Sequence, residues 1–159
     1  MKRIALLFSL LLLCSGCNAP TPTATDLLAK LLAYPDIPAV TVYFQGALAG
    51  ETGYLSGEEF RRLYGGQDPA RLSDEYAIAL GKDDSIYEIH LFHALDAEKA
   101  EAIEANLRYR QALLWKQDTA FYDPDNPAAG SIIWKRGKWV CLLVTNDNER
   151  AVEVLKNAL

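Results

Sequence analysis

The N-terminal segment restricts the fold of this chain more than any other feature, because it decides which residues remain to form a domain. Lys2 and Arg3 precede an uncharged, leucine-rich stretch, Ile4–Leu13, and two small residues follow that stretch. This order is typical of an export signal. The apolar stretch has ten residues, whereas a helix that spans a bilayer needs roughly 20. We therefore predict a signal peptide at residues 1–16 and exclude it from the fold.

Two cysteines close this segment, in the sequence LCSGC of residues 13–17. The surrounding export signal argues against a redox or zinc role for the pair. The sequence resembles the bacterial lipobox, in which small residues precede a cysteine that is diacylated and becomes the first mature residue. The resemblance implies a diacylglycerol on Cys17, and with it a lipid anchor at the outer, extracytoplasmic face of the bacterial cytoplasmic membrane.

The two cysteines also allow two other interpretations. Acylation of Cys14 is disfavoured, because three leucines would then precede the cut instead of small residues. Cys14 itself occupies a position at which the lipobox usually has leucine, and cysteine is a small hydrophobe that substitutes mildly. The remaining alternative is an ordinary secretory signal whose cysteines are incidental.

The mature chain has the size of a single domain. Removing 16 of the 159 residues, two of them basic, leaves 143 residues with 14 basic and 21 acidic side chains and a net charge of −7. This charge argues against nucleic acid and anionic headgroups as direct ligands. Attachment to the membrane would then depend on the acyl chains. Cys141 becomes the only other cysteine, so an internal disulfide is excluded, and its apolar surroundings predict a buried side chain.

The chain after the cysteine divides into a tether and one folded domain. Residues 17–25 hold the lipidated cysteine and the segment NAPTPTAT, whose prolines and lack of charge predict a flexible, extended tether. Residues 26–159 form the domain, with Asp26 as the N-cap of a first short helix. Ser56 and Glu59 predict a capping box at the start of the second helix.

The remaining elements alternate between strands and helices. Extended segments are predicted at residues 39–45, 76–80 and 86–92, and a hairpin with a two-residue turn at Arg136-Gly137. A long helix follows Asp96 to about residue 117, and a C-terminal helix begins near Asn146. The sum is an α+β fold: a mainly antiparallel sheet of four or five strands, with the long central helix and the C-terminal helix packed on it.

Residues 55–159 resemble a known bacterial lipoprotein family. The segments that carry the resemblance are RRLYGG, IYEIHLFHALDAEKAEAIEANLRYRQ and IIWKRGKWVCLLVTND. With the lipobox, they are similar to lipoproteins that contain domain of unknown function 4358. The resemblance implies a location and a fold but no established chemistry.

Trp134 and Trp139 are the candidate binding residues. A turn at Arg136-Gly137 would place them directly opposite each other on one face of the hairpin. Both faces of the last strand are apolar, and helices must cover one of them. If the tryptophan face is left open, the pair forms an exposed platform for a sugar ring or a peptide. If helices cover that face, both residues belong to the core.

The histidines predict no shared metal site. His90 and His93 lie three residues apart on a predicted strand, so their side chains point to opposite faces. Asp123–Asn126 resembles the start of a calcium loop but lacks the required glycine and glutamate, and is predicted to be a solvated turn. The sequence predicts no metal and no cofactor.

Three functions follow from these features. The favoured one is a non-enzymatic module that binds another envelope protein or a cell-wall component, because an anchor is predicted and no catalytic pattern is recognised. The alternative is an envelope hydrolase with an unrecognised carboxylate and histidine site, for which Glu88 and His90 are candidates. The third is a structural or assembly factor without a small ligand.

Overall fold

The predicted α+β fold is confirmed in the computed structural model, which describes residues 21–83, 85–118 and 128–159. The helices are α2 (Ala24–Leu31), α3 (Gly57–Leu63), η1 (Pro69–Leu72), α4 (Ala97–Asp118) and α5 (Asn148–Ala158). The strands are β1 (Val40–Phe44), β2 (Ser73–Gly81), β3 (Glu88–Ala94), β4 (Ile132–Arg136) and β5 (Trp139–Val144).

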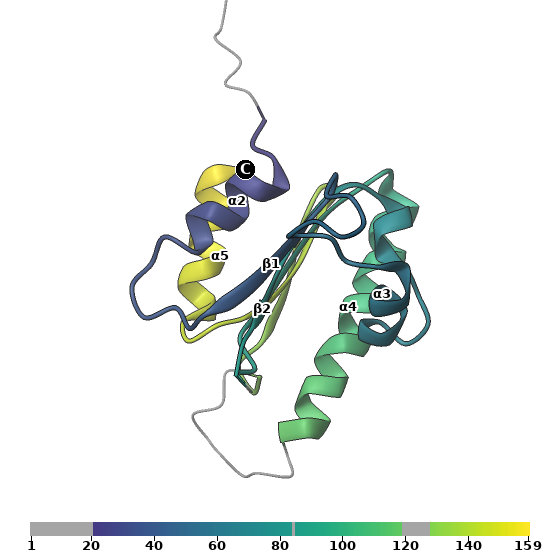
Figure 1. Ribbon diagram of the computed structural model, residues 1–159. Helices are drawn as coiled ribbons and strands as arrows, with labels where there is room; N and C mark the ends of the chain where they lie inside the picture. The colour runs from purple at the N-terminus through teal and green to yellow at the C-terminus, as the bar shows by residue number, and fades with distance from the viewer. Residues whose placement is uncertain (1–20, 84, 119–127) are drawn as a thin grey trace, which may run out of the picture.

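The five strands form one antiparallel sheet in the order β1-β2-β3-β5-β4. Helices cover both of its faces and make three layers (Figure 1). Helices α3 and α4 lie on one face, and α2 and α5 lie on the other. The expectation that helices cover only one face of the last strand is therefore wrong, and this explains why both faces of β5 are apolar.

Each face of the sheet has its own hydrophobic cluster. The cluster under α3 and α4 includes Phe60, Leu63, Ile78, Phe92, Ile103, Leu107, Val140 and Leu142. The cluster under α2 and α5 includes Leu27, Leu31, Ile89, Leu91, Trp139, Cys141, Leu143 and Leu155. Successive side chains of a strand point to opposite faces, so the central strands supply both clusters and are apolar throughout. Cys141 is fully buried, as predicted.

The two short helices begin with side-chain caps. Ser56 and Glu59 form the predicted capping box of α3. Helix α2 starts three residues earlier than predicted, and its N-cap is Thr23 rather than Asp26. Asp26 is the third residue of the helix, and its carboxylate accepts the backbone N–H of Thr23 over 3.0 Å. The end of the predicted tether therefore belongs to the folded domain.

The C-terminal hairpin is confirmed, but its register differs from the prediction. Arg136 pairs with Trp139, so the two-residue loop is Gly137-Lys138 and Trp134 lies opposite Cys141. Gly137 has φ +60° at the first loop position, where a type II′ turn requires glycine. Moving the loop by one residue shifts the pairing by two. Every side chain therefore keeps its face while its partner changes.

The two ends of the described chain lie at the same end of the domain. The chain enters α2 and leaves α5 at the top of the view in Figure 1, whereas the loop after α2 and the start of α5 lie lower. In the part of the chain that the structure describes, no helix combines the length and the apolar character needed to cross a membrane.

Candidate functional site

The two tryptophans predicted to bind a ligand lie on the face that α2 and α5 cover. Trp139 is 5% exposed, and Trp134 is half-buried against the same cluster. The ring of Trp139 packs 4.8 Å from that of His93, measured between centroids. Trp139 is therefore a core residue, because helices cover the face that an exposed platform would require.

Glu88 and His90, the residues predicted for a hydrolase, meet in a buried polar network under α4. His90 Nε2 lies 2.8 Å from Glu88 Oε2, and the Arg110 guanidinium donates to both oxygens of this carboxylate. His90 Nδ1 lies 2.5 Å from the hydroxyl of Tyr64. An ionised carboxylate can only accept, so the histidine proton is assigned to Nε2 and Tyr64 donates to Nδ1.

The carboxylate, imidazole and phenol of this network are all paired within it. Burial alone would raise the pKa of Glu88, but hydrogen bonds from His90 and Arg110 outweigh it and lower the pKa to about 2. Burial raises the pKa of Tyr64 well above 10.0. His90 has no exposed surface and Glu88 is 5% exposed. The pair converges as the hydrolase hypothesis requires, but it is sealed inside the domain and holds α3, β3 and α4 together.

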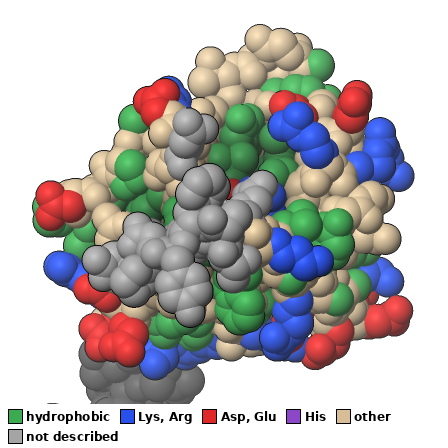
Figure 2. Space-filling view, turned by 90° about the horizontal axis from the view of Figure 1, so that it is seen from below, with side chains coloured by type: hydrophobic (Ala, Val, Ile, Leu, Met, Phe, Trp, Pro, Cys, Tyr) green, Lys and Arg blue, Asp and Glu red, His purple; other side chains and the backbone are tan. Residues whose placement is uncertain are grey.

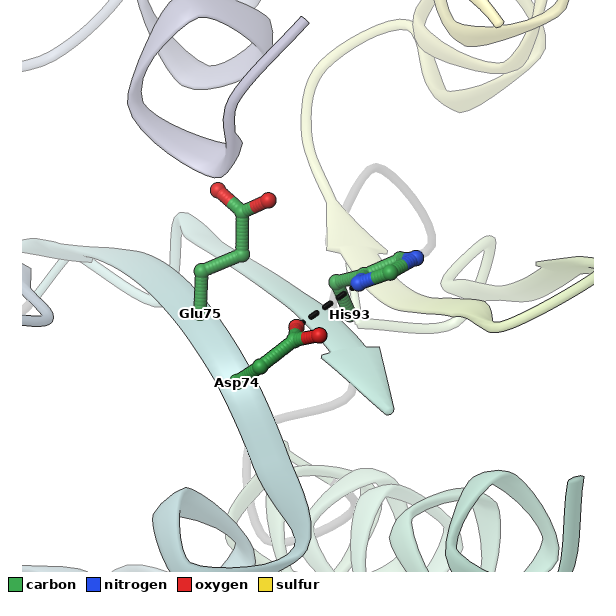
Figure 3. Close-up of side chains that lie close together, drawn as sticks. All are labelled: Asp74, Glu75 and His93. Carbon is green, nitrogen blue, oxygen red and sulfur yellow. Dashed lines mark hydrogen bonds and ion pairs between the residues drawn. The ribbon is translucent and has the colours of Figure 1, made fainter. Parts of the chain in front are cut away.

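A second polar cluster lies on the opposite face of β3 and contains His93, Asp74 and Glu75 (Figure 3). The two histidines therefore point to opposite faces, as predicted. The register of β2 shifts between Ser73 and Glu75, which makes Asp74 the extra residue of a β-bulge. His93 Nδ1 donates to Asp74 Oδ1 over 2.7 Å. The Oε2 atom of Glu75 accepts the backbone N–H of Ala24, at the start of α2, over 2.7 Å.

These three side chains could hold a divalent transition metal. Each offers one ligand atom, and the three atoms lie within 4.8 Å of one another. Imidazole and carboxylate are zinc ligands, and three protein ligands leave a fourth tetrahedral position open for water or substrate. The side chain of Asp74 is 47% exposed and that of His93 is 25% exposed, so solvent reaches the cluster. Sequence reasoning missed it because strand periodicity alone does not reveal the bulge.

A cavity of about 230 Å³ lies at the opposite end of the domain from the start of α2. The loop after α2, the start of β3, the end of β5 and the first turn of α5 form its walls. Its lining includes the apolar side chains of Leu31, Ile37 and Ile89 and the polar side chains of Tyr87, Asn146 and Arg150. Figure 2 views the domain from this lower end, where hydrophobic side chains lie among acidic and basic ones.

Two tyrosines, Tyr34 and Tyr87, line the cavity. The guanidinium of Arg150 lies 4.1 Å from the centroid of the Tyr34 ring, as a cation–π pair at the mouth. Tyr87 is 4% exposed, and its hydroxyl has no hydrogen-bond partner among the described residues. Burial raises the pKa of Tyr87 to about 12, so the hydroxyl keeps its proton near neutral pH. The Tyr87 hydroxyl is not among the buried unpaired atoms of the described residues, so it is open to solvent and can donate to an acceptor placed in the cavity.

Sequence reasoning did not find this cavity. Its walls come from segments about 50 residues apart in the chain, and none of the three segments carries a recognised motif. Tyr34 and Pro35, which follow the first helix, also line the cavity. Cys17, the predicted lipidation site, and Asp123–Asn126, the predicted turn, both lie outside the described residues.

No protein-family model, curated protein or solved structure matches this chain.

Proposed function

We propose that this chain is a lipid-anchored extracytoplasmic protein that binds an envelope protein or a cell-wall component without transforming it. The observation that carries the proposal is the cavity lined by Tyr87 and Arg150. It lies at the end of the domain away from the start of α2, so a tether from Cys17 would present it away from the membrane. The resemblance to lipoproteins with domain of unknown function 4358, at the lipobox and over residues 55–159, supports the location.

The anchor is tested by metabolic labelling with an alkyne fatty acid. Wild type and Cys14→Ser are expected to incorporate the label equally, and Cys17→Ser to incorporate none. The matched pair separates the two cysteines, because each variant removes one sulfur from the same segment. Label that persists in Cys17→Ser, or is lost in Cys14→Ser, contradicts the anchor as proposed.

The binding role is tested by crosslinking in the native envelope. A photo-crosslinking amino acid replaces Asp36, which is exposed and lines the cavity. The control replaces Glu98, an exposed residue of α4 on the other face of the sheet. We expect a discrete adduct from position 36 and none from position 98. Equal adducts, or none from either position, argue against a binding role for the cavity.

A second candidate function, an envelope hydrolase, is favoured by the exposed Asp74, Glu75 and His93 cluster. The sealed Glu88 and His90 pair cannot serve it. A zinc ion held by the cluster with one open position would activate a bound water by lowering its pKa. To bind the ion through Nδ1, His93 would have to carry its proton on Nε2 and give up the hydrogen bond to Asp74.

Calorimetric titration of the full chain with Zn²⁺ tests this candidate. One ion per chain is expected for wild type and for Glu98→Gln, which removes an exposed carboxylate elsewhere. His93→Gln should weaken binding by at least tenfold. Failure of wild type to bind Zn²⁺, or unchanged binding by His93→Gln, excludes a metal-assisted hydrolase at this cluster.

A further inference from the structure

The size of the cavity restricts its ligand. Pockets that hold drug-sized molecules measure roughly 300–1,000 Å³, and this cavity measures about 230 Å³. The ligand group that enters is therefore smaller than a drug molecule, on the scale of one six-membered ring with a short substituent.

The interior of the cavity combines an apolar wall with a tyrosine hydroxyl. Leu31, Ile37 and Ile89 supply apolar surface, and the Tyr87 hydroxyl, which makes no hydrogen bond to a described residue, remains accessible to solvent. A methyl group gains by burial against such a wall, and a carbonyl oxygen beside it would accept the hydrogen bond that the hydroxyl does not make. An acetamido group carries both parts two bonds apart. A ring hydroxyl would satisfy the donor but leave the apolar wall unused.

The mouth of the cavity has groups of both charges. Asp36 contributes a carboxylate and Arg150 a guanidinium, and both are exposed. The amide of Asn146 donates to the Asp36 carbonyl over 3.3 Å, and its own oxygen can act as an acceptor. Donors and acceptors without an excess of positive charge suit an uncharged ligand with several hydroxyls better than a phosphate or a carboxylate. The guanidinium of Arg150 covers one face of the Tyr34 ring, and this contact holds the cation at the mouth.

We infer that the cavity binds an N-acetylated amino sugar, with the acetamido group inside against Tyr87 and the ring hydroxyls at the mouth near Asp36 and Arg150. This inference rests on the proposed binding function and names the ligand class for its site. A free sugar and a sugar unit of the cell-wall glycan present the same chemistry.

Ligand-observed NMR on the full chain in detergent micelles tests the inference, with N-acetylglucosamine as the probe. Glucose is the matched control, because it has the same ring with a hydroxyl in place of the acetamido group. We expect the strongest saturation transfer at the acetamido methyl and weak or no transfer to glucose. Tyr87→Phe removes only the hydroxyl and should raise the Kd about fivefold, the loss of one ordinary hydrogen bond.

The variant control is Tyr76→Phe, a tyrosine of similar burial on the opposite face of the sheet. It should bind N-acetylglucosamine like wild type, and thermal unfolding should show that both variants are folded. Equal binding of the two sugars, no binding of either, or equal weakening by the two variants overturns the inference.

Sedimentation with purified cell wall distinguishes a free sugar from a sugar unit of the glycan. It also tests the ligand class separately from the binding function. Retention that excess N-acetylglucosamine abolishes supports the inference, with the glycan as source. Binding of the free sugar without retention supports it with a free sugar as source. Retention that the sugar does not compete overturns the ligand class but leaves the binding function standing. Loss of both retention and the adduct at position 36 overturns both.

Discussion

At the scale of single residues, the buried Glu88 network is the most consequential feature. Removing an ion pair from water costs several kcal/mol per charge, and only good geometry with further hydrogen bonds offsets this cost. Glu88 has both: Arg110 contacts its two oxygens, and His90 completes the set. Removing one partner would leave a charge inside the domain without a counter-charge. The native arrangement therefore depends on all three partners being present.

Glu88 should make the domain sensitive to acid. Its pKa in the folded state is about 2, below its ordinary value of 4.5. Because the folded value is lowered, the stabilisation is complete above pH 4.5 and is lost as the pH falls toward 2. The loss should amount to about 3 kcal/mol. Urea denaturation at a series of pH values measures it.

Glu88→Gln is the control for this pH dependence. It keeps the shape of the side chain and removes the titrating group, so most of the acid sensitivity between pH 4.5 and 2 should disappear, at a lower stability near neutral pH. If Glu88→Gln loses stability on acidification as steeply as wild type, another carboxylate is responsible.

Trp139 and Trp134 should differ sharply in their effect on stability. Trp139→Ala removes a buried ring from the core under α2 and α5 and should lower the free energy of unfolding by about 3–5 kcal/mol. Trp134→Ala removes a half-buried ring at the edge strand β4 and should cost clearly less. Denaturant unfolding of the two variants measures the difference. A Trp139→Ala domain as stable as wild type would restore the exposed-platform interpretation.

At the scale of secondary-structure elements, the caps decide where the short helices begin. Helices of seven and eight residues are marginal in water without tertiary contacts. The capping box of α3 was predictable because Ser56 and Glu59 have the required spacing just before an apolar residue. The capping box of α2 has aspartate at the position that usually holds glutamate. The sequence pattern therefore indicated Asp26 as the N-cap instead of Thr23.

Ser56→Ala should lower the free energy of unfolding by about 1 kcal/mol, because the N–H of Glu59 loses its acceptor. Ser56→Asn keeps an acceptor at the N-cap and should restore most of the loss. Thermal and urea unfolding of the three proteins measure both effects. Equal destabilisation by alanine and asparagine would mean that the cap bond contributes little.

The hairpin shows how far a local pattern determines an element. Gly137 was enough to predict the turn. The alternation of side chains along a strand was enough to predict the face on which each one lies. The loop could still begin at either of two positions, because both keep the alternation intact. The positive φ of Gly137 decides between them, since it places the glycine first in the loop.

At the scale of the whole molecule, the two faces of the sheet explain what the sequence could not reveal. Strands buried on both faces lack the alternation that would tell which side is covered. The fold class and the order of elements were predictable from local patterns, whereas the three-layer packing was not. The cavity and the Asp74 cluster were also beyond reach, because each joins segments that are distant in the chain or brought together by a bulge.

Because both helical layers share one sheet, the domain should unfold as a single unit. Leu155→Ala removes a fully buried side chain from the layer of α2 and α5 and should cost about 2–5 kcal/mol. Tryptophan fluorescence and far-ultraviolet circular dichroism should report the same shifted midpoint in urea. Two separate transitions would show that α2 and α5 melt independently of α3 and α4.

The sealed position of Cys141 has a practical consequence. Burial raises the pKa of its thiol, and a thiol that stays protonated and inaccessible reacts with neither maleimides nor disulfide reagents. If the sulfur of Cys17 carries a lipid, the native mature protein has no thiol that reacts with thiol labels. A cysteine introduced anywhere on its surface would then be a unique attachment point for a spin label or a fluorophore, and its distance to the membrane could be measured on living cells.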